Sequence, residues 1–264
     1  MSETNPSGAG SVAASETGEY TSGPVAGIAR MSGVSFTDKF LRYADVDGLA
    51  IFEGDIVLGT VDRVRAGAGL GPGGVPIGIA IIGTQFLWPF TVVPFEIDPA
   101  LPNQQRVTDA VTHWNALTFL RFRPRTPSDT DFVRFISGPG SNSPVGRQGG
   151  PQHIQLKDNA SFGTVVHEMG HTIGLFHEQS RADRNDFIEV RVDNIDPVER
   201  HNFEQEIRDG IDLGPYDFGS IMHYNEKAFS INNQPTIVPK VPIAAGGHDG
   251  PAGAIVLGRR QSRQ

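Results

Sequence analysis

Three histidines and one glutamate stand at fixed spacings in one short stretch, residues 167–177, which reads HEMGHTIGLFH. His167 and His171 are four residues apart, so on a helix their imidazoles share one face, one turn apart. Two imidazoles placed in this way can bind one Zn²⁺ at about 2.0–2.1 Å each. Gly174 allows the chain to leave the helix sharply, because glycine accepts positive φ at a helix end. The turn then brings His177 back as a third nitrogen ligand.

Glu168 directly follows the first histidine, close enough to hold a metal-bound water without being a ligand itself. This is the arrangement for general-base activation of water. Three protein ligands leave one coordination position open, which is typical of a catalytic zinc site rather than a structural one. We therefore expect one zinc ion per chain. The alternative is an amphipathic helix whose histidines only make hydrogen bonds, and it requires every position of the motif to match by chance.

The composition excludes several other kinds of chemistry. The net charge of the 264 residues is −8 without a block of basic residues, so we expect no nucleic-acid or membrane-surface partner. The absence of cysteine excludes thiol catalysis, disulfides and Cys-type zinc sites. The sequence contains no run of about 18 apolar residues, so we expect no membrane-spanning helix. The first residues lack an apolar h-region, so we expect no Sec-type signal peptide in this sequence.

The chain divides by composition into three parts. Residues 1–30 are rich in small and polar residues, and we expect a disordered tail there, since they cannot bury enough apolar surface to fold. Residues 31–78 contain apolar anchors and end in a Gly-rich stretch. They are too few to make a core alone, so we expect them to pack along another surface and to join residues 79–264 through a flexible, protease-accessible linker.

Apolar patterns within residues 79–264 predict several strands and helices. Strands are predicted at 90–97, 120–123, 132–136, 153–156 and 236–239. Helices are predicted at 103–115, within 194–208, and over a segment capped by Asp158 or Asn159 that carries the histidines and ends at Gly174. The Gly-, Ser- and Pro-rich stretch 137–150 is predicted to be a loop.

The extended histidine motif resembles that of the metzincin zinc peptidases. The residues that make the resemblance specific to the astacin family are Glu178 after the third histidine and the segments SIMHY (220–224), RADR (181–184) and VGRQGG (145–150). The resemblance runs from about Ile79 to Lys240. It implies an α+β, two-lobed metzincin-type zinc peptidase domain, with a twisted mixed sheet and two long helices above the cleft and a mostly irregular lobe below, preceded by an extended propeptide. It also implies peptide-bond hydrolysis, protein or peptide substrates and an extracellular location.

The resemblance further implies roles for single residues. Tyr224 would be an additional zinc ligand that swings away to stabilise the oxyanion, Met222 would form the floor beneath the metal, and Glu178 would receive the mature N-terminus in a buried salt bridge. Without the resemblance, the residues alone favour core packing for Tyr224 and Met222. His223 is expected to be structural. The histidines without ligand spacing, which we expect to bind no metal, are His113, His153, His201 and His248.

The segment Phe52-Glu53-Gly54-Asp55 resembles the F-x-G-D switch of astacin prosegments and implies a latent proenzyme. A carboxylate binds zinc at about 2.0–2.2 Å, so Asp55 would fill the open coordination position, with Gly54 permitting close approach of the backbone. The alternative is an ordinary turn residue beside a glycine. Activation, by another protease or by self-cleavage, would cut near Val75–Ile79, and the ammonium of Ile79 would pair with Glu178.

Two other functions remain open at the level of the sequence. One is a zinc hydrolase that acts on non-peptide amides, and the other is a non-catalytic binding protein stabilised by zinc. The presence of Glu168 beside an open metal position disfavours the second.

Overall fold

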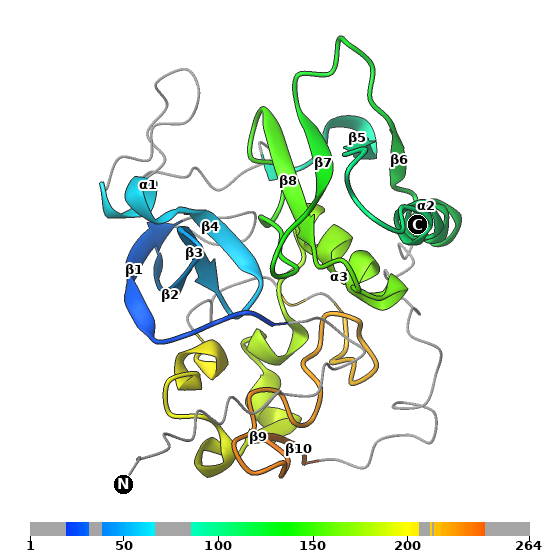
Figure 1. The fold of residues 1–264 in the computed structure, drawn as a ribbon. Helices are drawn as coiled ribbons and strands as arrows, with labels where there is room; N and C mark the ends of the chain where they lie inside the picture. Colours follow the sequence, from blue (N-terminus) through cyan, green and yellow to red (C-terminus); the bar gives the residue numbers. More distant parts are fainter. Residues whose placement is uncertain (1–19, 32–38, 67–85, 206–211, 213, 241–264) are drawn as a thin grey trace, which may run out of the picture.

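The computed structural model describes residues 20–31, 39–66, 86–205, 212 and 214–240. The first part of the predicted tail, the Gly-rich linker, Ile79 and His248 lie outside this range. Figure 1 shows two sheets side by side in the upper half of the molecule and mostly irregular chain below them. The strand orders are β1-β2-β3-β4 in one sheet, β6-β5-β7-β8 in the other, and β10-β9 in a small third sheet.

The first sheet is antiparallel and consists of β1 (Val25–Met31), β2 (Lys39–Val46), β3 (Leu49–Phe52) and β4 (Ile56–Thr60), followed by the short helix α1 (Val61–Arg65). One prediction was wrong here, because the tail expected to be disordered through residue 30 contains β1. The segment expected to be extended forms the other strands of this sheet. Small residues explain the error, because a Cβ on Gly27 would lie 2.5 Å from the Tyr43 hydroxyl, so this strand packs closely beneath a large neighbour.

The second sheet carries the histidine helix. Its strands β5 (Val92–Ile97), β6 (Arg121–Pro124), β7 (Phe132–Ser137) and β8 (Pro151–Leu156) all pair in parallel. An antiparallel bridge between Asn142 and Gln155 at the β8 edge makes the arrangement mixed, as predicted. The predicted strands are confirmed within two residues. The first of them starts late because Phe90 and Thr91 have positive φ and belong to a turn, Pro89–Thr91.

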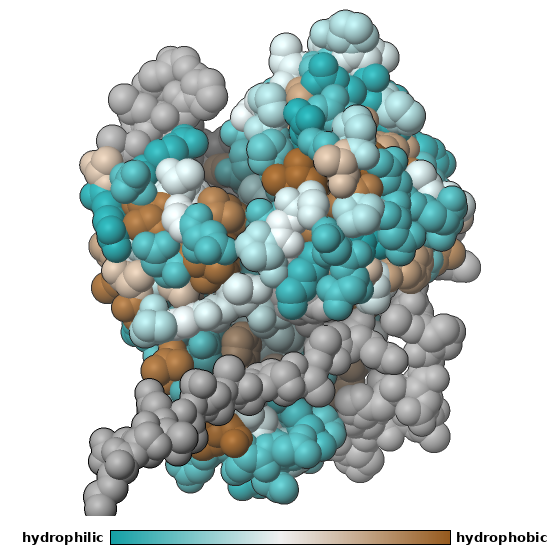
Figure 2. Space-filling model, in the orientation of Figure 1, coloured by the Kyte–Doolittle hydropathy of each residue, from teal (hydrophilic) through white to brown (hydrophobic). Residues whose placement is uncertain are grey.

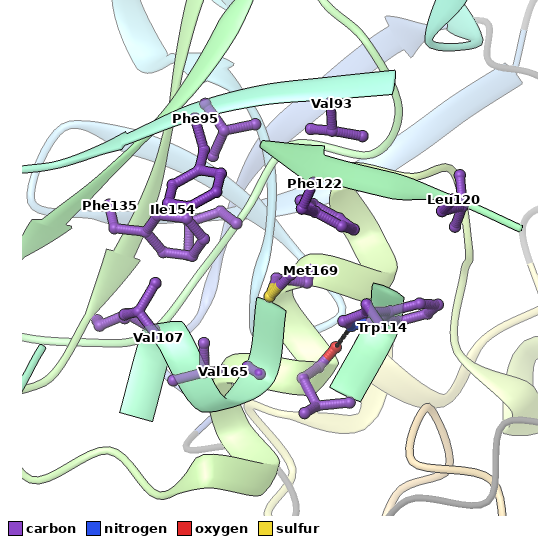
Figure 3. Close-up of a cluster of buried hydrophobic side chains, with 14 of the residues drawn as sticks. Val93, Phe95, Val107, Trp114, Leu120, Phe122, Phe135, Ile154, Val165 and Met169 are labelled. Atoms are coloured by element: carbon purple, nitrogen blue, oxygen red, sulfur yellow. Dashed lines mark hydrogen bonds between the residues drawn. The ribbon is translucent and has the colours of Figure 1, made fainter. Parts of the chain in front are cut away.

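The main core lies between this sheet and the helices α2 (Gln105–Leu117) and α3 (Phe162–Thr172), which pack against each other. Figure 3 shows Phe95, Phe135 and Ile154 of the sheet facing Val107 and Met169 of the helices. The helix predicted at 103–115 is confirmed as α2, and of its regularly spaced apolar residues Val107, Ala110 and Trp114 are fully buried and Val111 is partly buried. Each large side chain in such a core contributes about 1.5–3 kcal/mol. On the face seen in Figure 2, hydrophobic residues form only small, separate areas.

The lower part consists of short 3₁₀ turns and two three-residue strands. The turns are Glu178–Ser180, Arg184–Asp186, Val192–Asn194 and Arg200–Phe203, and the strands are β9 (Ile188–Val190) and β10 (Ile237–Pro239). As far as residue 205, the helix predicted within 194–208 is therefore reduced to the 3₁₀ turn Arg200–Phe203. The Asp196 carboxylate accepts from Val198 N at 3.0 Å, and Ile195 bridges to Ser230, so these bonds replace a helical start. Among the described residues, no helix is long and apolar enough to cross a membrane.

Candidate metal centre and active site

Helix α3 begins and ends where its sequence can satisfy the terminal backbone groups. The Ser161 hydroxyl accepts from Thr164 N at 3.1 Å and caps the N-terminus, so the predicted cap at Asp158 or Asn159 was wrong. Asp158 instead accepts from the Ser137 hydroxyl at 2.5 Å. After Thr172 the chain turns at Gly174, whose φ of 110° is unfavourable for any other residue. This turn directs the following segment back across the end of the helix.

The three predicted zinc-binding histidines converge in the structure. Their ring centroids lie 4.7 Å (His167–His171), 4.8 Å (His171–His177) and 5.3 Å (His167–His177) apart, and all three are buried. Nδ1 of His167 lies 2.7 Å from the Ile221 carbonyl oxygen, and Nδ1 of His171 lies 2.8 Å from that of Leu175. A carbonyl oxygen only accepts, so Nδ1 carries the proton in each ring and Nε2 is left to bind a metal.

Asp55, from the turn between β3 and β4, lies among these Nε2 atoms. Its Oδ2 is 3.1 Å from Nε2 of His167 and 3.2 Å from Nε2 of His177, and its Oδ1 is 3.3 Å from Nε2 of His171. Burial alone would raise the pKa of the Asp55 carboxyl, but the neighbouring His177 and His171 hold it well below its usual range. The structure therefore places a carboxylate where the sequence predicted the fourth ligand.

The four residues fit a metal ion. Their ligand atoms lie within 4.8 Å of one another, and no other group of this kind exists in the described part of the chain. Asp55 Oδ1 and His171 Nε2 are buried without a hydrogen-bond partner. Burying such atoms unsatisfied costs about 1–3 kcal/mol each, a cost that a cation between them would remove. Three imidazole nitrogens and one carboxylate oxygen are a donor set suited to zinc, and one zinc ion fits this group.

Glu168 lies beside the cluster and is completely buried. Neither of its carboxylate oxygens has a hydrogen-bond partner. Burial, and secondly the negative charge of Asp55, raises the pKa of Glu168 well above its usual value. A buried carboxyl group with a raised pKa and free oxygens is suited to accepting and returning a proton.

Met222 lies under the histidine helix. A Cβ on Gly170 would lie only 2.6 Å from Met222 Sδ, so the helix and this segment approach closely because residue 170 has no side chain. Nε2 of His223 lies 2.7 Å from the Tyr216 hydroxyl, and Nδ1 of His223 lies 2.6 Å from the Tyr224 carbonyl oxygen. These contacts fit the structural role predicted for it.

Tyr224 is also buried, and its hydroxyl donates to the backbone carbonyl of Glu53 at 2.6 Å. Tyr224, the predicted additional ligand, thus lies beside the cluster, with its ring centroid 4.8 Å from that of His177. It also contacts the upstream segment, by which we mean the chain before residue 79, described at 20–31 and 39–66. Burial raises the pKa of Tyr224 well above its usual value, so the phenol keeps its proton.

The turn that carries Asp55 is held on both sides. Glu53 and Gly54 both have positive φ, 48° and 82°, and Phe52 is buried in a cluster with Leu41, Ile56, Val145 and Phe176. Ser143 N donates to the Asp55 carbonyl at 3.0 Å, and Val57 N donates to the Ser143 carbonyl at 3.0 Å. Ile56 thus bridges in parallel to Ser143, and the neighbouring Asn142 bridges to Gln155 of the edge strand β8.

Sequence reasoning missed three residues at the site. Glu53 Oε2 lies 2.8 Å from Nδ1 of His177, and the Ser180 hydroxyl donates to Glu53 Oε1 at 2.6 Å. Tyr20 lies against Tyr224, and Thr21 N donates to the Gly54 carbonyl at 2.7 Å. The only signal for Glu53 was its place inside the four-residue switch motif, and nothing in the sequence signalled Ser180 or Tyr20.

The remaining predicted site residue, Glu178, accepts from Asp217 N at 2.9 Å, with the Arg181 guanidinium at 3.4 Å. Burial raises the pKa of Glu178 to about 6. Its predicted partner, the ammonium of Ile79, lies outside the described residues, so that pairing stays a prediction. His113, His153 and His201 lie outside the metal-binding group.

Residues 81–247 match the family model for Astacin, which describes a peptidase family. The zinc metalloproteinase nas-14 of Caenorhabditis elegans is 42% identical over 163 residues, covering 58% of this chain and 32% of its own length. Meprin A subunit beta of Homo sapiens is 33% identical over 201 residues, a match that covers 74% of this chain and 26% of meprin's own length. The chain thus spans about a third or less of these curated relatives.

Among solved structures, high choriolytic enzyme 1, a hatching-enzyme zinc protease from Oryzias latipes, is similar, with a TM-score of 0.53 and 34% identity. The match covers 58% of this chain and 80% of that one. It confirms the predicted α+β metzincin fold. Because the family model also covers more than half of the sequence, including all three histidines, this chain belongs to the astacin family of peptidases.

Proposed function

We propose that the protein is a zinc-dependent endopeptidase made as a latent proenzyme. The observation that carries this proposal is the buried cluster of His167, His171 and His177 around Asp55, with the unpaired Glu168 beside it. The relatives named as zinc metalloproteinases support the same reaction, and their substrates are proteins or peptides by name.

Zinc held by the three histidines would supply a Lewis acid that lowers the pKa of water and polarises the scissile carbonyl. Glu168 takes the proton of the attacking water and later gives it to the leaving amine. Tyr224, once released from Glu53, donates its phenol proton as a hydrogen bond to the developing oxyanion. An extended substrate pairs with the main chain at Ser143, whose carbonyl oxygen accepts from Val57 N in the uncut chain.

Latency follows from the placement of the upstream segment. Asp55 lies among the three histidines, where its carboxylate would take the place of a zinc-bound water, and Ile56, directly after it, bridges to Ser143. We propose that residues up to 78 form the inhibitory segment and that a cut near Val75–Ile79, by another protease or by the enzyme itself, starts activation. The ammonium of Ile79 then pairs with Glu178. By analogy with the family, the enzyme acts outside the cell.

The experiment compares the full chain before and after cleavage at a protease site inserted in front of Ile79. Casein and a peptide library, analysed by mass spectrometry, should be cut after cleavage, and a zinc chelator should abolish the activity. Glu168→Gln should keep zinc but lose activity by about 10²–10⁴-fold, since the amide cannot take a proton.

Other outcomes identify the other functions. Hydrolysis of small non-peptide amides without peptide cleavage would indicate a different zinc hydrolase. Zinc binding without any hydrolysis, equal in wild type and Glu168→Gln, would indicate a non-catalytic zinc-stabilised protein.

A further inference from the structure

The Nδ1 atoms of the three histidines, called here the outer nitrogens because the Nε2 atoms face Asp55, have partners of two kinds, backbone carbonyls and a carboxylate. His167 and His171 are each oriented by a backbone carbonyl, from Ile221 and Leu175, that belongs to the same domain as the histidines. His177 is oriented by a side-chain carboxylate, that of Glu53, which comes from the upstream segment. One of the three histidines that would hold the metal is therefore oriented by Glu53, a residue of the segment that we propose is removed on activation.

Glu53 is fixed in this position by several contacts. Its side chain is buried, the Ser180 hydroxyl donates to the carboxylate oxygen that does not face His177, and the Tyr224 hydroxyl holds its backbone carbonyl. Its φ of 48° lies in the left-handed region, which a residue with a side chain adopts only when its surroundings enforce it. The carboxylate thus bridges two residues of one loop, His177 and Ser180, three positions apart.

A carboxylate on the outer nitrogen fixes the tautomer and orientation of a ligating histidine and increases its basicity. Removing such a partner typically weakens metal binding by about 10–100-fold. We propose that Glu53 is a positioning residue for zinc, so that the proenzyme holds its ion more tightly than Asp55 and the three histidines alone would. This rests on the proposed function, since it takes the cluster to be a zinc site.

The test measures zinc affinity and zinc dissociation of the full chain by competition with a chromophoric chelator. Glu53→Gln keeps the size of the side chain and removes its charge, and it should weaken zinc binding about 10–100-fold. The matched control is Glu189→Gln, an exposed residue of β9 that pairs with Arg191, and it should leave the affinity unchanged. Ser180→Ala, which frees one oxygen of Glu53, should weaken binding by a smaller factor.

A second readout separates positioning of the metal ligand from a general effect on folding. With Co²⁺ bound in place of zinc, the visible absorption bands should shift in Glu53→Gln and stay in place in Glu189→Gln. If Glu53→Gln does not fold, Ser180→Ala carries the same test.

Two failures are distinguishable. If Glu53→Gln binds zinc within about threefold of wild type and the Co²⁺ bands do not move, this inference is wrong and the proposed function stands. If the wild-type chain itself holds no zinc, the proposed function fails.

Discussion

Tyr20 lies directly against Tyr224, with ring centroids 4.4 Å apart and planes tilted by 54°. On the other side, the Tyr224 hydroxyl donates to the Glu53 carbonyl. Two parts of the upstream segment that are distant in sequence, one before β1 and one after β3, thus hold the same side chain. The tyrosine that we propose acts on the oxyanion is engaged by both.

Tyr20→Ala in the full chain should release part of this hold. Contacts between aromatic rings contribute about 0.5–1.5 kcal/mol, so self-cleavage or residual peptidase activity should rise by a few-fold up to about tenfold. The measurement is hydrolysis of a quenched fluorescent peptide by the uncut chain. Phe40→Ala, which removes an exposed aromatic side chain from the upstream sheet, is the control and should change nothing. Equal rates for the two variants would contradict the role of Tyr20.

Asp55→Ala in the uncut chain should give measurable peptidase activity or faster self-cleavage. The carboxylate is lost from among the histidines, while Val57 still bonds Ser143 and Glu53 still bonds Tyr224, so partial activity is expected. Asp62→Ala in α1 is a control acidic residue on the same segment and should stay latent. The latency proposal fails if the wild-type uncut chain is already as active as the cleaved one.

Tyr224→Phe should lower kcat of the cleaved enzyme and leave KM close to the wild-type value. On the substrate, the phenol is proposed to bind the developing oxyanion and not the ground state, and the loss of one such donor costs up to about 10²–10³-fold. Steady-state kinetics on one peptide provide the comparison. An effect confined to KM would assign Tyr224 to substrate binding instead.

His171→Ala should remove most of the metal. Wild type should hold about one zinc per chain, because the described residues contain a single three-histidine group. Elemental analysis of the purified proteins checks both values. His153→Ala, which changes an exposed side chain of the edge strand β8, should retain the wild-type zinc content, and a loss there would point to a second site.

Gly170→Ala should destabilise the protein although alanine favours helices. The added methyl group would meet Met222 Sδ at 2.6 Å, and forcing such a group into a packed core costs about 1–3 kcal/mol. Denaturant unfolding measures the loss. The double variant with Met222→Ala should lose less than the sum of the two single variants, since the clash is then gone. Simple additivity would show that the two residues do not press on each other.

The centre of the site could be predicted from the sequence because its geometry is local. Spacing by four places His167 and His171 on one helix face, and a glycine turn returns His177 within the same short stretch. Asp55 lies far away in sequence, and only the resemblance of its surrounding motif to a known switch pointed to it.

The rest depended on tertiary contacts that no local pattern encodes. The strand β1 lacks large aromatic side chains, and it is held because Gly27 fits beneath Tyr43. The cap of α3 is Ser161, directly before Phe162, whereas Asp158 bonds Ser137 across the fold. Ser180 and Tyr20 gained their roles only by meeting Glu53 and Tyr224 across the fold.

The upstream sheet is built from neighbouring antiparallel strands and has a buried cluster of its own, Ala29, Tyr43, Ala50 and Val61, while its Leu41 and Phe52 are buried against Val145 and Phe176 of the catalytic domain. Severing the chain behind α1 would therefore leave this sheet bound to the domain as an inhibitor. The cut would convert an intramolecular contact into an intermolecular one, and the high effective concentration supplied by the covalent connection would be lost. Activation would then have two stages, cleavage and departure. Its second stage would become more complete on dilution, and the freed sheet would compete with substrate until it is diluted or degraded.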